Sequence, residues 1–84
     1  MQQTRRYSLG TICRANKAKV KSLKLYEDMK IGMPYLLCPC SLQGQFVTIQ
    51  NEISPGNYVV TLNNSKKLKL SVFHSEDLVP RNQL

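Results

Sequence analysis

Residues 45–62 read QFVTIQNEISPGNYVVTL, a run rich in β-branched and aromatic residues that Pro55-Gly56 interrupts once. Proline suits the second position of a tight turn because its ring presets φ, and glycine accepts the positive φ of the third position. The flanking segments 45–51 and 58–62 are therefore predicted to pair as a β-hairpin. Alternate residues of the second segment fall on one face of its strand, namely Tyr58, Val60 and Leu62.

A third strand is predicted directly after this hairpin. Asn63-Asn64-Ser65 is typical of a turn, and residues 66–73, which read KKLKLSVF, alternate again. We expect Leu68, Leu70 and Val72 to point inward and Lys67 and Lys69 to point to solvent. The three segments together predict a β-meander.

The first third of the chain allows two interpretations. Residues 6–14 indicate a strand, and residues 17–21 alternate before the apolar positions slip by one, as a β-bulge would cause. The rival is a helix over about residues 16–30, whose shared face would hold Ala18, Ser22, Leu25, Tyr26 and Met29. Strands are preferred, because Val20 and Leu23 fall off that face and the acidic pair Glu27-Asp28 would lie at the unfavourable end of the helix dipole. The helix stays open as the alternative.

The tail completes the expected architecture. Residues 74–80, HSEDLVP, resemble the closing segment of SH3-like barrels, in which one helical turn leads into a last short strand. Turn signals recur about every 8–12 residues along the chain. The sequence thus predicts a single all-β domain over residues 1–84, a small SH3-like barrel of five to six short antiparallel strands. The alternative is an α+β fold, with one helix near residues 16–30 packed on the β-meander.

Charge is the most informative bulk property. The formal net charge is +7, eight cations fall within residues 1–30, and residues 31–65 contain no Lys or Arg. Such asymmetry indicates a basic face directed at a polyanion, although some basic proteins are simply soluble. On one strand Lys17, Lys19 and Lys21 would repeat about every 6–7 Å, near the spacing of phosphates.

We therefore expect a small, non-enzymatic nucleic-acid-binding protein. Lysines outnumber arginines eight to four, which favours contacts to the backbone of DNA or RNA that tolerate any sequence. The plainer explanation of the lysines is protection of a sheet edge. The candidate phosphate contacts are Arg5, Arg6, Arg14, Lys17, Lys19, Lys21, Lys24, Lys66, Lys67 and Lys69. The candidate stacking platforms are Tyr7, Tyr26, Tyr35 and Tyr58.

The alternative function is a protein-interaction module, an adaptor or inhibitor that docks on an acidic patch of a larger protein. The same cations would then speed association. The uncharged stretch 31–62 would supply the apolar centre of the interface, with Tyr35, Leu36, Leu42 and Phe46.

Catalysis, metals and cofactors are not expected. Cys13, Cys38, Cys40 and His74 lack the paired spacing of a zinc site, and Cys-Pro-Cys is one residue shorter than the usual redox motif. There is one histidine to serve as a base, and no glycine-rich phosphate loop.

The expected location is the cytoplasm. No apolar run approaches the roughly 20 residues that a bilayer requires, so no membrane is expected. The chain begins with Met, and its first residues do not resemble a secretory leader. We therefore expect a complete protein of the cytoplasm. Three cysteines, an odd number, are expected to stay reduced. We expect a monomer or a dimer.

Overall fold

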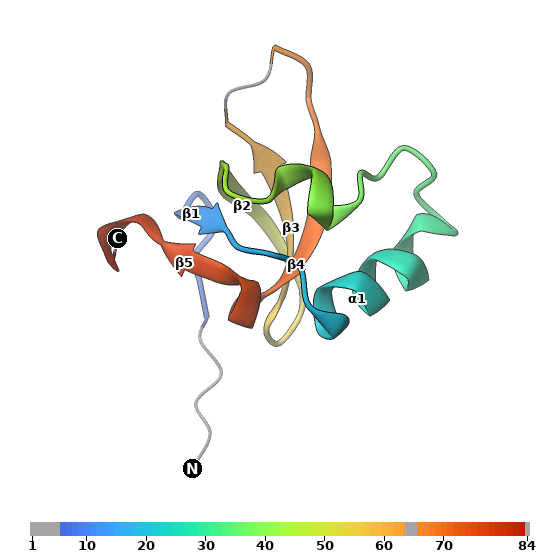
Figure 1. The fold of residues 1–84 in the computed structure, drawn as a ribbon, viewed down its shortest axis with the longest axis horizontal. Helices are drawn as coiled ribbons and strands as arrows, with labels where there is room; N and C mark the ends of the chain where they lie inside the picture. Colours follow the sequence, from blue (N-terminus) through green and yellow to red (C-terminus); the bar gives the residue numbers. More distant parts are fainter. Residues whose placement is uncertain (1–5, 64–65, 84) are drawn as a thin grey trace.

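Five strands form one antiparallel sheet in the order β4-β3-β2-β1-β5 in the computed structural model, which describes residues 6–63 and 66–83 (Figure 1). The strands are β1 (Ile12–Ala15), β2 (Phe46–Ser54), β3 (Asn57–Leu62), β4 (Leu70–His74) and β5 (Leu78–Pro80). One α-helix, α1 (Val20–Lys30), is joined by three 3₁₀ turns, η1 (Pro39–Leu42), η2 (Ser75–Asp77) and η3 (Arg81–Gln83). β4 and β5 are the two edges of an open sheet, so the predicted closed barrel is not confirmed.

The central hairpin is confirmed. β2 and β3 pair from Val47 opposite Leu62 to Ser54 opposite Asn57, and Gly56 adopts a φ of 83°. Two register shifts along β2 increase the local twist of the pair. Tyr58 and Val60 are fully buried, as their alternation predicts. Local turn chemistry and period-2 alternation are enough to specify this part of the fold.

The third strand is correct in place, with Val72 buried and Lys67 and Lys69 exposed as expected, but Phe73 and Ser71 rather than Val72 face the main core. β4 begins at Leu70, and Leu68, which was expected to point inward, is 78% exposed. Phe73 and Ser71 lie opposite Tyr58 and Val60, so they share the face that holds the main core. Burial of the Phe73 ring outweighs that of the smaller aliphatic side chains and sets the phase of the strand.

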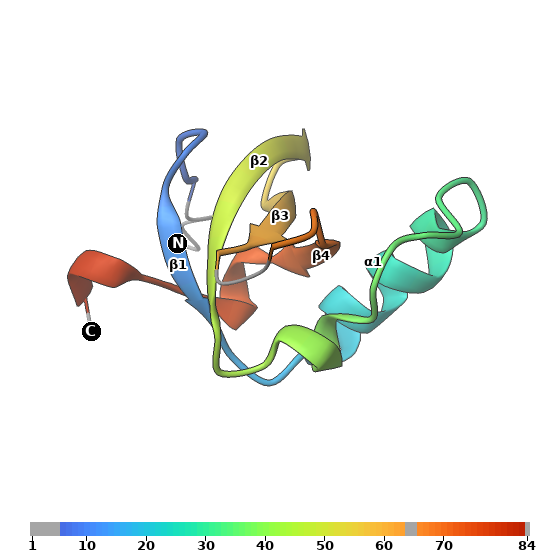
Figure 2. The same ribbon diagram turned by 90° about the horizontal axis from the view of Figure 1, so that it is seen from above.

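The strand predicted for residues 17–21 is wrong, because the chain forms α1 there and the alternative interpretation is correct. Ser22 is buried and Leu25, Tyr26 and Met29 are half-buried, which is the predicted helical face. Figure 2 shows α1 on the outer side of β4, away from the interior enclosed by the strands. Val72 points to that side of β4 and is buried although it lies outside the main core cluster.

Helix α1 and the loop after it also cover the free edge of β4. The Ser22 hydroxyl accepts a hydrogen bond from the His74 backbone N–H at 3.0 Å. The Leu37 N–H donates to the Leu70 carbonyl at 2.9 Å. Two backbone groups of this edge, the His74 N–H and the Leu70 carbonyl, therefore have partners within the chain.

Both ends of the chain differ little from expectation. The first strand is shorter than predicted, because residues 8–11 form a turn in which Gly10 has a φ of 88°. At the other end η2 leads into β5, which pairs with β1, and this confirms the predicted helical turn and final strand. No helix in the described part of the chain is long and apolar enough to cross a membrane.

Candidate nucleic-acid interface

One group of the predicted cations lies around the start of α1. Lys17 precedes the helix, Lys19 is its N-cap residue, and Lys21 and Lys24 lie in its first turns. All four are exposed. They do not form the evenly spaced row expected of a strand, because the backbone there is helical.

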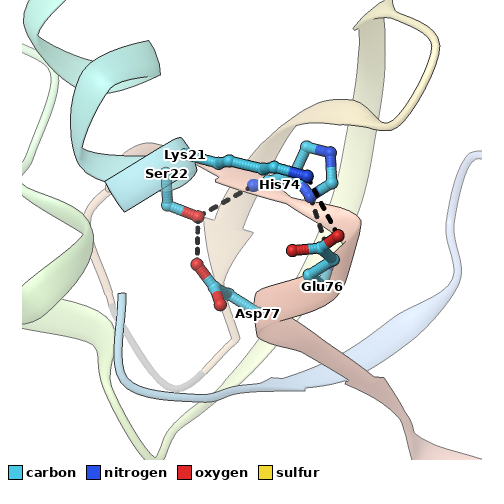
Figure 3. Close-up of polar contacts among 5 residues, drawn as sticks. All are labelled: Lys21, Ser22, His74, Glu76 and Asp77. Carbon is cyan, nitrogen blue, oxygen red and sulfur yellow. Dashed lines mark hydrogen bonds and ion pairs between the residues drawn. The ribbon is translucent and has the colours of Figure 1, made fainter. Parts of the chain in front are cut away.

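Acidic groups accompany these helix cations. Lys21 Nζ lies 3.0 Å from Glu76 Oε1, and both side chains are more than half exposed (Figure 3). The Lys21 ammonium donates a hydrogen bond to the Glu76 carboxylate, and this bond and the positive charge lower the pKa of Glu76. Lys21 and Lys24 also line a shallow cavity of about 280 Å³ together with Asp28 and His74. Positive charge at this end of the molecule is thus partly compensated.

A second group lies at the other end of β4, where β2 begins. Arg14 on β1 is exposed and stands directly opposite Phe46 on β2 and Val79 on β5. The Asn63 N–H donates to the Phe46 carbonyl at 3.1 Å, so the loop between β3 and β4 leaves the sheet beside Phe46. That loop carries the exposed cations Lys66, Lys67 and Lys69. We call Arg14 and these three lysines the loop-end cations.

Arg81 belongs with this second group, although no sequence pattern pointed to it. It lines a cavity of about 220 Å³ with Ile12, Phe46 and Asn63. It also borders a wider hollow of about 560 Å³ beside Gly10 and Pro80. Arg81 is not part of a cluster of basic residues in the sequence, so nothing there indicates a binding role. The pairing of β5 with β1 brings it close to Phe46.

The two groups are not one surface. Lys69 comes directly before the first residue of β4, whereas Glu76, the partner of Lys21, follows its last residue. Arg6 lies elsewhere and pairs with Glu52 at 3.1 Å, which raises the pKa of the arginine and lowers that of the carboxyl. Arg5 lies outside the described residues. The continuous basic face expected from the sequence is therefore divided.

The acidic residues lie in elements other than those that carry the loop-end cations. The five acids of the chain are placed in α1, in the far half of β2 and in η2, as Glu27, Asp28, Glu52, Glu76 and Asp77. Within residues 6–63 and 66–83, Arg14, Lys66 and Lys69 have no carboxylate within ion-pair distance. The positive charge here is less compensated than around α1.

The expected stacking platforms change. Tyr58 is fully buried, with Tyr7 packed on it at 5.5 Å between ring centroids, so neither ring is a free platform. Tyr26 is half-buried beneath the ammonium of Lys30. Tyr35 is 66% exposed and Phe46 is 37% exposed, and of these two Phe46 has a cation, Arg14, directly opposite on the neighbouring strand.

The apolar centre expected for a protein interface is largely internal. Leu36 and Leu42 are 4% and 1% exposed, so that assignment is wrong for both. Leu42 belongs to the main core cluster. Leucines in an uncharged stretch can belong to a core as readily as to an interface, and Leu36 and Leu42 are buried inside the domain.

Ser22, His74 and Asp77 meet at the start of α1 without the geometry of a catalytic triad. The Ser22 hydroxyl donates to Asp77 Oδ2 at 2.5 Å and accepts from the His74 backbone, not from its ring (Figure 3). The imidazole Nδ1 accepts from the Glu76 N–H at 3.2 Å. The arrangement joins α1 to η2.

The three cysteines are free. Burial raises the pKa of Cys13 to about 11, and a hydrogen bond with Cys38 raises the pKa of the exposed Cys40. Within the described residues no group of three or more potential ligands could hold a metal ion. Raised pKa values disfavour the thiolate, which is the form that binds metals and attacks disulfides.

Comparisons with known proteins place the chain in no family. No family model matches it, and no curated protein or solved structure is similar enough to count as a relative.

Proposed function

We propose that this chain is a small nucleic-acid-binding module that contacts phosphates through its cations and catalyses no reaction. The observation that carries the proposal is the loop-end group, in which Arg14, Lys66 and Lys69 lie at one end of the sheet and have no carboxylate of the described residues within ion-pair distance. Uncompensated cations gathered at one end of a small domain favour a polyanionic ligand.

The division of the basic residues sharpens this proposal. The helix cations share their surroundings with Asp28 and Glu76, so we assign them a supporting role in attraction over longer distances. The loop-end cations are assigned the direct contacts. The excess of lysine, together with a helix α1 that contains no arginine, favours binding that tolerates any base sequence.

A cytoplasmic location is part of the proposal. Three free cysteines are suited to a compartment that keeps thiols reduced.

The test is a titration of labelled random-sequence DNA and RNA at several salt concentrations. Affinity should fall steeply with salt, because each phosphate contact releases counterions and contributes a slope of roughly −0.7 to −0.9 in log affinity against log salt. An Arg14→Gln/Lys69→Gln variant should lose between one and two units of that slope. The matched control is Lys17→Gln/Lys24→Gln, which removes the same charge beside α1.

The outcomes are distinct. A larger loss for the loop-end variant than for the helix variant supports the assignment. Equal losses would mean that net charge alone attracts the ligand. Absence of binding at low salt would overturn the proposed function and leave docking on an acidic protein surface as the explanation of the charge.

A further inference from the structure

The outer face of the sheet beside the loop-end cations combines an aromatic ring, polar side chains and arginines. Residues whose neighbours in sequence are buried point outward here: Ile12 and Arg14 on β1, Phe46, Thr48 and Gln50 on β2, and Val79 on β5. In the part of the chain that the structure describes, α1 covers the outer side of β4 and leaves this region open. We call these six residues the open face.

Phe46 is placed for contact with a planar ligand. Its ring is 37% exposed although Val47 beside it is fully buried, so the strand presents the ring to solvent. The ring borders the cavity of about 220 Å³ that it shares with Ile12, Asn63 and Arg81. An exposed aromatic ring at the rim of a hollow is a platform on which another ring can stack.

Two arginines lie near that ring, on the side of β2 where β1 and β5 follow in the sheet. Arg14 is the direct neighbour of Phe46 on β1, with about 5 Å between such cross-strand Cβ atoms. Arg81 borders the same cavity from the end of β5. A nucleotide offers a flat base linked to an anionic phosphate, and this arrangement matches both parts of it.

Polar groups on the open face are already held in fixed positions. The Gln50 side-chain amide donates to Thr61 Oγ1 at 2.9 Å, and the Thr48 hydroxyl donates to the Asn63 side-chain oxygen. These two bonds orient the Thr48 and Gln50 side chains on the outer face of β2, next to Phe46. A preorganised surface loses less entropy when a flexible strand binds to it.

We infer that the open face binds single-stranded nucleic acid, with an unpaired base stacked on Phe46 and its phosphates beside Arg14 and Arg81. This inference rests on the proposed function and narrows it to one class of ligand. Bases in a duplex already stack on each other, so their faces are not available to a protein ring. The open face therefore prefers single strands over duplexes.

The test compares three labelled oligonucleotides of about 15 nucleotides, a length of the order that one small β domain covers. The first is single-stranded thymidine, the second has the same phosphates but abasic sugars, and the third is a duplex. Binding to the full-length protein is followed by fluorescence anisotropy at low salt. We expect the base-bearing strand to bind best, and the abasic strand at least about 5-fold more weakly.

Variants then locate the contact. Phe46→Ala should weaken binding of the thymidine strand between about 5-fold and 150-fold, the range that one stacked base contributes. Phe46→Tyr, which keeps the ring, should restore the affinity, and Phe46→Leu should not. Tyr35→Ala is the matched control, because Tyr35 is more exposed than Phe46 and lies in the loop after α1.

The results separate this inference from the proposed function. Equal binding of base-bearing and abasic strands, or unchanged binding after Phe46→Ala, overturns the stacking contact while cation-dependent binding stands. Tighter binding to the duplex also overturns it. No binding to any of the three probes overturns both proposals. If Phe46→Ala does not fold, the comparison of base-bearing and abasic strands on the unaltered protein decides.

Discussion

Asp77 Oδ2 lies 2.5 Å from the hydroxyl of Ser22, a residue 55 positions earlier in the chain, and both side chains are buried. The same oxygen accepts the backbone N–H of Lys19 at 2.9 Å. Lys19 is the N-cap residue of α1 and makes no capping bond with its own side chain. A carboxylate from η2 thus binds the N–H of the N-cap residue, the bond that a glutamate at the third helical position makes in a capping box.

Asp77→Ala is expected to destabilise the fold by about 2–4 kcal/mol, because it leaves the buried Ser22 hydroxyl and the part-buried Lys19 N–H without their acceptor at the positive end of α1. Asp77→Asn keeps one acceptor oxygen and should cost less. Chemical denaturation measures both. The control is Asp28→Ala, which removes an exposed acid near the other end of the helix and should change the midpoint little. A loss for Asp28→Ala equal to that for Asp77→Ala would contradict the capping role.

Acid should weaken the fold through Glu52 and Glu76. Their partners Arg6 and Lys21 lower both carboxyl pKa values from the usual 4.5. A folded-state pKa below the unfolded one adds stability that is fully present above the unfolded value and is lost as pH falls through the folded value. The expected loss therefore begins below about pH 4.5 and is complete when both groups are protonated. Denaturation of a Glu52→Gln/Glu76→Gln variant across this range should show a shallower decline, and a decline as steep as in the parent would argue against these pairs.

Cys13 should resist modification in the folded protein. Its side chain is fully buried and its pKa is about 11, so only about one thiol in a thousand is ionised at pH 8. Cys40 is exposed and should react first with iodoacetamide despite its own raised pKa. Peptide mapping after brief treatment reads the result, and denaturant should abolish the difference. Rapid native labelling of Cys13 would mean that the sheet opens readily between β1 and its neighbours.

Gly56→Ala should destabilise the hairpin by about 1–2 kcal/mol, because Gly56 has a φ of 83° and a Cβ is disfavoured in that conformation. Gly32→Ala is the matched control, since Gly32 does not have a positive φ and a Cβ there would meet nothing within 4 Å. The control should be neutral or slightly stabilising. Thermal unfolding of the two variants tests this, and equal melting temperatures would be inconsistent with a turn held by positive φ.

How much of the fold could be predicted depends on the range of the interactions involved. The hairpin, its turn and the closing segment rest on neighbours in sequence, and all three are confirmed. The helix ranks below a strand in the sequence because Val20 and Leu23 fall off its face and Glu27-Asp28 lie at the unfavourable end of its dipole. The contact that supports the helix, from Asp77 to Lys19, spans 58 positions and cannot be read from the local pattern. The phase of β4 depends on which side chain fills the core, and the sequence offers two alternating sets there.

The candidate site follows the same rule. Composition identifies the cations but does not tell which of them meet an acid. Lys21 pairs with Glu76 across 55 positions, and Arg14 becomes the neighbour of Phe46 only through the pairing of β1 with β2. Phe46 was assigned to a protein interface for its apolar character, and its place beside arginines requires the sheet.

The covered edge of β4 bears on how copies of the chain behave when crowded. The His74 N–H donates to Ser22 and the Leu70 carbonyl accepts from Leu37, so two backbone groups that a strand from another copy would bind already have partners. The opposite border, β5, offers three residues and ends in proline, which has no N–H to donate. Both edges of the sheet therefore disfavour pairing with a strand of another copy, and concentrated preparations should stay clear and free of fibres.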